Sequence, residues 1–89
     1  MGILALAADE RVARVSFTDH SMSVALKDGR TITVPLAWYP RLLHASKAAR
    51  KNWKLCGAGY GIHWPDLDED LSTEGLLRGA PAPRPKRKK

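Results

Sequence analysis

The chain has 89 residues, 44% of them hydrophobic, which suits one small globular domain and leaves no room for two. Its single cysteine excludes an internal disulfide and a multi-cysteine zinc site within one chain, and favours a reducing cytoplasm. The net charge is +6, and five Lys or Arg residues with no Asp or Glu follow Gly79. The chain before that point is therefore nearly neutral, and the high pI is weak evidence that the folded domain binds nucleic acid.

The first nine residues are apolar up to Ala8 and then meet Asp9. This stretch is much shorter than the roughly 20 apolar residues of a membrane-spanning helix. We therefore expect an N-terminal arm or strand over residues 1–9 and no membrane association.

Apolar and polar residues alternate from residue 12 to residue 36, which predicts three half-buried antiparallel strands. In the first strand this alternation places Ala13, Val15 and Phe17 on one face. Turn residues at 18–21 and 27–29 separate the strands.

The second turn can be specified further because cross-strand partners share one face of a sheet. A two-residue loop would pair apolar residues with polar ones. A three-residue loop at 27–29, with Gly29 in the left-handed region, instead pairs Val24 with Ile32 and Met22 with Val34. We predict that register.

One main helix is expected from Pro40 to about Asn52, since proline suits the first turn of a helix. One helical stripe would contain Leu42, Ser46, Ala49 and Trp53, and a basic face would contain Lys47, Lys51 and Lys54.

The rest of the domain is expected to hold a glycine-rich turn at 57–61, a short late strand at 62–64 and an acidic loop at 66–70. Ser72 is a good N-cap for a short C-terminal helix over 73–78, and Gly79 is a typical stop. The predicted fold is α+β: a three-stranded antiparallel meander plus a short late strand, packed with one main helix and a short C-terminal helix. It forms a single domain over residues 10–79, and residues 80–89 form a disordered tail rich in proline and basic residues.

Nothing in the sequence forms a recognisable catalytic constellation. The glycines at 57, 59 and 61 follow a helix and precede Ile-His-Trp-Pro, whereas a phosphate loop leads into a helix and carries Gly-Lys-Ser/Thr. We therefore expect a non-enzymatic protein with no cofactor and no metal.

The sequence supports two alternative hypotheses for a binding surface, one for a protein partner and one for nucleic acid. Tryptophan and tyrosine are frequent in protein interfaces, and the acidic loop adds charge beside them. The predicted partner-binding residues are Trp38, Tyr39, His63, Trp64, Asp66, Asp68, Glu69 and Asp70. The alternative is a nucleic-acid surface that grips phosphates. Its residues would be Lys47, Lys51, Lys54, Arg84, Lys86, Arg87, Lys88 and Lys89.

A metal-dependent hydrolase is the remote alternative, with His63, Asp66, Asp68 and Asp70 as ligands. The alternating acids are typical of a calcium loop, but an EF-hand also needs glycine at the sixth position and glutamate at the twelfth. Here those positions hold Leu71 and Leu77.

Several blocks of the sequence resemble a known bacterial family, catalogued as domain of unknown function 2442. The resemblance covers about residues 10–79 and excludes the tail. The blocks are residues 17–20 (Phe-Thr-Asp-His), 28–30 (Asp-Gly-Arg), 34–42 (Val-Pro-Leu-Ala-Trp-Tyr-Pro-Arg-Leu), 52–53 (Asn-Trp), 61–72 (Gly-Ile-His-Trp-Pro-Asp-Leu-Asp-Glu-Asp-Leu-Ser) and 75–77 (Gly-Leu-Leu).

The resemblance implies a small α+β fold. It also implies an accessory protein encoded beside a second small protein, in an arrangement that looks like a toxin–antitoxin pair. Some relatives carry an added DNA-binding helical domain, which this chain lacks, and the family offers no catalytic residues to carry over. The function expected is that of a small antitoxin-like or regulatory module that binds a protein partner, with the product of an adjacent gene as the candidate. Weak nucleic-acid binding is the alternative.

Overall fold

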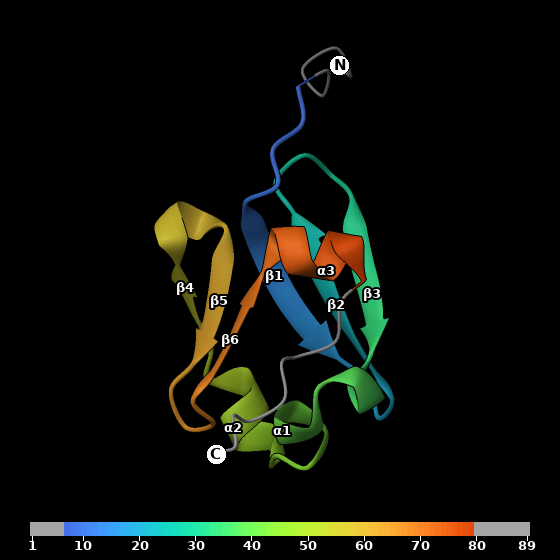
Figure 1. Cartoon of the computed structure of the whole chain (residues 1–89), viewed down its shortest axis with the longest axis vertical. Helices are drawn as coiled ribbons and strands as arrows, with labels where there is room; N and C mark the ends of the chain where they lie inside the picture. Colours follow the sequence, from blue (N-terminus) through green and yellow to red (C-terminus); the bar gives the residue numbers. More distant parts are fainter. Residues whose placement is uncertain (1–6, 80–89) are drawn as a thin grey trace, which may run out of the picture.

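The structure is a computed structural model, and it describes residues 7–79. The predicted meander is its first sheet, and strand β2 lies in the centre (Figure 1). The three-residue turn is confirmed: Met22 pairs with Val34, Val24 pairs with Ile32, and Gly29 has φ +99°. The strands are β1 (Val12–Phe17), β2 (Ser21–Leu26) and β3 (Thr31–Pro35).

The first strand contains a β-bulge that the alternation pattern did not predict. Val12 pairs with Leu26 and Arg14 with the adjacent Ala25, so Ala13 is the extra residue. The bulge turns Val12 and Val15 to the same buried face and leaves Ala13 exposed. The prediction that Ala13 shares the apolar face with Val15 is therefore wrong.

A second antiparallel sheet stands where the sequence predicted one short late strand. Its strands are β4 (Lys54–Cys56), β5 (Gly61–Trp64) and β6 (Glu69–Ser72), in that order. All three residues of β4 are exposed, so it shows no alternation. In β6 the inward positions hold Glu69 and Leu71. Because one of these two residues is charged, the sequence lacks the alternation of apolar and polar residues that indicates a strand. Lys54 consequently belongs to a strand and not to a basic helix face.

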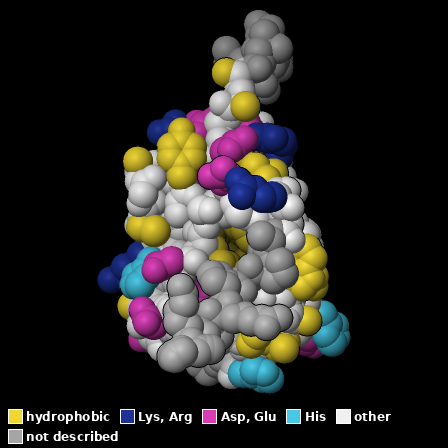
Figure 2. All heavy atoms as spheres, viewed as in Figure 1, with side chains coloured by type: hydrophobic (Ala, Val, Ile, Leu, Met, Phe, Trp, Pro, Cys, Tyr) yellow, Lys and Arg dark blue, Asp and Glu magenta, His cyan; other side chains and the backbone are white. Residues whose placement is uncertain are grey.

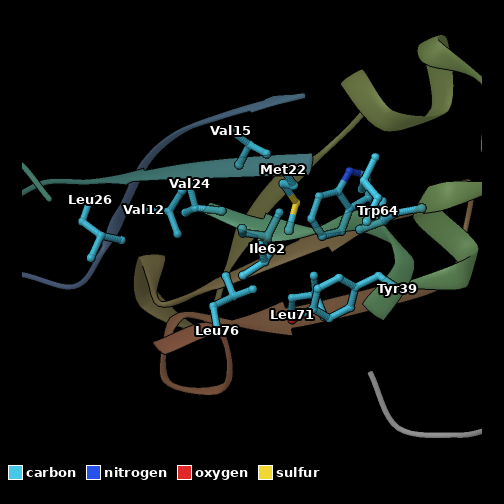
Figure 3. Packing of buried hydrophobic residues seen from close by; sticks show 13 residues of the cluster. Val12, Val15, Met22, Val24, Leu26, Tyr39, Ile62, Trp64, Leu71 and Leu76 are labelled. Carbon is cyan, nitrogen blue, oxygen red and sulfur yellow. The ribbon is translucent and has the colours of Figure 1, made fainter. Parts of the chain in front are cut away.

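The two sheets pack face to face around one apolar core (Figure 3). The helices α1 and α2 close one end, and α3 contacts both β3 and β6 (Figure 1). The buried apolar residues are Val12, Val15, Met22, Val24, Leu26 and Val34 from the first sheet, Ile62, Trp64 and Leu71 from the second, and Leu36, Tyr39, Leu42 and Leu76 from the segments around them.

The main helix is divided in two, which corrects the prediction of one continuous helix. After a 3₁₀ turn, η2 (Leu36–Trp38), the chain forms α1 (Pro40–Leu43) and then α2 (Lys47–Lys51). Ser46 is the N-cap of α2, where its side chain accepts a hydrogen bond from the amide of Ala49. Serine favours this capping role over a place inside a helix, because its hydroxyl competes with the helical hydrogen bonds.

The C-terminal helix, α3 (Thr73–Arg78), has the predicted caps. The Ser72 hydroxyl accepts a hydrogen bond from the amide of Gly75, and Gly79 adopts the left-handed conformation at φ +81°. No helix within residues 7–79 is long and apolar enough to cross a bilayer. The expected tail at 80–89 and most of the expected N-terminal arm lie outside the described residues.

Trp64 joins three parts of the molecule. Its ring is fully buried among residues of both sheets (Figure 3). The indole Nε1 donates a hydrogen bond of 2.9 Å to the Arg50 carbonyl in α2. The ring also meets Phe17 of β1 edge to face, with centroids 6.5 Å apart. One side chain thus ties α2 and β1 to the second sheet.

We predict that Trp64→Phe lowers the free energy of unfolding by about 2 kcal/mol, because it removes the hydrogen bond to Arg50 and leaves part of the indole volume empty. Urea denaturation followed by circular dichroism measures this change. Trp38→Phe is the control: Trp38 is only partly buried, and its substitution should cost clearly less. Equal costs for the two variants would contradict the role assigned to Trp64.

Candidate functional site

Three of the predicted partner-binding residues are in the interior. Tyr39, Trp64 and Glu69 are 1%, 0% and 6% exposed, so a partner cannot touch them in this conformation. Their aromatic rings and the glutamate face the core because they occupy inward positions of η2–α1, β5 and β6. Trp38 is partly buried beside Gly79, and its ring would be in van der Waals contact with a Cβ at that position.

The other predicted partner residues are at the surface of the second sheet. His63 and Asp70 are cross-strand partners on its outer face, and His63 Nδ1 lies 2.5 Å from Asp70 Oδ1. Lys54 is the partner of His63 on the other side, so a row of three charged or polar side chains crosses the sheet. Figure 2 shows basic, histidine and acidic side chains next to one another over this part of the molecule.

The acidic turn is held by hydrogen bonds to neighbouring segments. Asp66 Oδ2 accepts a hydrogen bond of 3.1 Å from the Asn52 side chain. The carbonyl of Asp68 accepts one of 2.6 Å from Arg41. Asp68 itself has φ +51°. Because the four proposed metal ligands are divided among these separate contacts, they do not converge. No group of three His, Cys, Asp or Glu side chains placed to hold a metal ion occurs within residues 7–79.

Glu69 is a buried acid whose nearest positive charge, the Arg41 guanidinium, is itself half exposed. Burial raises the pKa of its carboxyl above the usual value, and the Arg41 guanidinium opposes this rise. Arg41 is half exposed, and its Nη1 lies 3.7 Å from the carboxylate, so it compensates for only part of the cost of burial. Burial and the nearby charge of Glu69 also raise the pKa of Tyr39.

A groove of about 450 Å³ opens between the end of β1 and α2. One wall is the continuous segment 15–19, and the other is formed by α2 and the residue that follows it toward β4. We call it the basic groove. It is lined by Val15, Ser16, Phe17, Thr18, Asp19, Lys47, Arg50, Lys51 and Trp53.

Arg50 is fixed in this groove by three contacts. Its Nε and Nη2 each donate a hydrogen bond of 2.9 Å, to the carbonyls of Leu42 and Leu43 at the end of α1. Its guanidinium carbon lies 5.7 Å from the centre of the Phe17 ring, a cation–π distance. The guanidinium therefore forms a rigid positive element of the groove wall beside an aromatic ring.

The charge of the groove is mainly positive. Lys47 and Lys51 are exposed and form no ion pair with any residue in the described range, and Asp19 is the single acid in the lining. Phe17 and Trp53 are partly buried and give an apolar surface between these charges. Such a surface suits a ligand that carries both apolar groups and negative charge.

Sequence reasoning identified only part of this groove. Lys47 and Lys51 were predicted as basic residues, but as a phosphate-binding helix face together with Lys54, which lies on the second sheet. Phe17, Arg50 and Trp53 were not predicted as site residues. The available signal was Trp53, an aromatic residue two positions beyond the lysine-rich helix α2. The basic tail residues Arg84, Lys86, Arg87, Lys88 and Lys89 lie outside the described range.

A second hollow, near the N-terminal end of β1, has both of its acids, Asp9 and Asp28, in ion pairs with arginines. Arg30 lies 2.7 Å from Asp28 and Arg11 lies 2.6 Å from Asp9. The hydrogen bonds from Arg30 and from the amides of Asp9 and Arg30 hold the pKa of Asp28 well below its usual range. This cluster stabilises the β2–β3 turn against the arm, because the Asp9 amide donates to Asp28 at 2.9 Å.

Comparison with known proteins gives one family and two structures. A family model described as "Protein of unknown function (DUF2442)" matches residues 12–82. A crystal structure of a protein of unknown function from Rhodospirillum rubrum is 30% identical, with a TM-score of 0.72 over 86% of this chain and 95% of the other. An NMR structure of an uncharacterized protein from Chromobacterium violaceum is 19% identical, with a TM-score of 0.70 over 82% of this chain and 69% of the other. At that identity the similarity establishes a shared fold and nothing about function. No curated protein matches the chain.

We predict that Glu69→Gln raises the free energy of unfolding at pH 7. The folded pKa of Glu69 exceeds the unfolded one, so its charged form opposes folding, and stability falls as the pH rises between those two values. The variant should be more stable than the parent at pH 7, and the difference should vanish below about pH 3, where the carboxyl is protonated in both states. Urea denaturation at a series of pH values measures it.

The control for this experiment is Glu74→Gln. Glu74 is 78% exposed and pairs with Arg78 one helical turn away, so its substitution should change stability by less than about 0.5 kcal/mol. A Glu69→Gln variant that is less stable than the parent at pH 7 would mean that the ion pair with Arg41 outweighs the cost of burial.

Proposed function

The chain belongs to the DUF2442 family, and on this premise we propose that it is a non-enzymatic binding module that acts through a protein partner seated in the basic groove. The observation that carries this proposal is the composition of the groove. Phe17 and Trp53 offer apolar contact area, while Lys47 and Lys51 lack intramolecular counter-charges among the described residues. Aromatic anchors with a charged rim are typical of protein interfaces.

The role of such a module would be regulatory or antitoxin-like, with the product of an adjacent gene as partner. The exposed acidic residues Asp66, Asp68 and Asp70 would form a second, separate contact area on the same partner or remain solvated. The burial of Tyr39, Trp64 and Glu69 removes them from the proposed interface. Cytoplasmic location is part of the same proposal.

Nucleic-acid binding is the competing function, and the distribution of charge supports it less well. Lys47 and Lys51 lie in α2, whereas Lys54 lies in the row with His63 and Asp70 on the outer face of the second sheet. A phosphate-binding stripe needs several cations along one line. The groove, by contrast, combines two free lysines with an apolar surface.

We predict that the double variant Lys47→Glu/Lys51→Glu binds the adjacent gene product about tenfold or more weakly, because both rim charges are reversed. Isothermal titration calorimetry on the full chain measures the affinity. The matched control is Arg14→Glu/Lys27→Glu, which makes the same change of net charge at two exposed residues outside the groove and should stay within about twofold of the parent.

Two outcomes would contradict the proposal. Equal losses in the two double variants would show that net charge, and not the groove, determines binding. Absence of binding to the adjacent gene product, together with salt-dependent binding of duplex DNA or RNA that the groove variant abolishes, would favour the nucleic-acid alternative.

A further inference from the structure

Four strands lie at the edges of the two sheets, and three of them carry features that block the addition of another strand. β3 ends in Pro35 and contacts α3. β4 has three residues, and β6 has four and continues directly into α3. Short strands, proline and covering helices are the devices by which proteins protect sheet edges.

The fourth edge, β1, is protected along only half of its length. Its N-terminal half contains the bulge at Ala13, and the side chain of Arg11, just before the strand, packs against Gly59. From Val15 to Phe17 the pairing with β2 is regular, and this half of the strand lines the basic groove.

The backbone groups that point into this open half can be identified from the pairing with β2. The amide of Thr18 donates to the carbonyl of Ser21 at 2.9 Å, so Thr18 bonds toward β2. In an antiparallel pair, hydrogen-bonded and non-hydrogen-bonded positions alternate. Ser16, opposite Ser23, therefore also bonds toward β2, and the amide and carbonyl of Val15 and Phe17 point away from it.

The position of the groove agrees with the direction in which the backbone groups of Val15 and Phe17 point. A groove on one face of a strand would touch every second residue, whereas this one touches the three consecutive strand residues Val15, Ser16 and Phe17 and continues into the turn that follows β1. It therefore runs along the edge of β1, with α2 and Trp53 as the facing wall. An added strand there would meet free backbone groups on one side and Lys47, Lys51 and Trp53 on the other.

We propose that the basic groove binds an extended acidic segment of the partner, which adds to the first sheet as a strand antiparallel or parallel to β1. The inference rests on the proposed function and specifies how the partner is bound. The backbone of Val15 and Phe17 supplies the hydrogen bonds, Phe17 and Trp53 contact apolar side chains of the segment, and Lys47 and Lys51 pair with its carboxylates. Charge complementarity selects an acidic segment, and strand addition is an established mode of peptide recognition.

The test uses the full chain and synthetic eight-residue peptides with alternating valine and aspartate. A strand added at an edge uses every second peptide amide for bonding to its neighbour. Two versions of the peptide are therefore N-methylated, one at the odd and one at the even positions. We predict that one version binds at least about tenfold more weakly than the unmodified peptide and that the other is unchanged within about twofold. Titrations followed by NMR measure both affinities and the shifts of the Val15 and Phe17 amides.

A peptide with lysine in place of aspartate is the charge control and should not bind. Equal effects of the two methylation patterns, or failure of the acidic peptide to move the Val15 and Phe17 amide signals at millimolar concentration, would overturn strand addition. Those results would leave the proposed function standing if the adjacent gene product still binds and the Lys47→Glu/Lys51→Glu variant still weakens it. Loss of that protein binding alone would reject the proposed function.

Discussion

The buried indole of Trp64 is the contact on which the arrangement of the rest of the molecule depends. It is the buried polar contact between the second sheet and α2, a five-residue helix with no buried residue of its own, whereas the bonds from Arg41 and Asn52 to the β5–β6 turn lie at the surface. A helix that short is not stable by itself in water. The hydrogen bond to the Arg50 carbonyl and the ring contact with Phe17 fix α2 and β1 at one separation, and that separation is the width of the basic groove.

Arg50 extends this arrangement from the core to the surface. Its carbonyl accepts from the indole, while its guanidinium donates to two carbonyls at the end of α1 and lies over Phe17. The last carbonyls of a helix lack partners inside the helix, and an arginine is well suited to satisfy them. The same residue therefore ends one helix and anchors the next, and the two lysines of α2 remain as the exposed charges of the groove.

Sequence reasoning predicted the parts of this fold that follow from local chemistry. The meander, its register through Gly29 and the two caps of α3 depend on alternation, turn residues and capping side chains close together in the chain. The bulge at Ala13, the break at Ser46 and the strands β4 and β6 depend on tertiary contacts, which can place glutamate inward and leave a whole strand exposed. The groove joins residues 15–19 to residues 47–53, and no local pattern links these segments.

The bulge in β1 also limits how much of this sheet edge is open to another strand. An uninterrupted edge of six residues with regular pairing would be a template on which a second copy could dock strand to strand, and repeated docking of that kind leads to aggregation. The extra residue at Ala13 breaks the ladder after Val12 and shortens the usable template to about one pair of free positions. The extra residue, second in the strand, thus confines the regular open edge to residues 15–17, a length that suits a short segment better than a whole second strand.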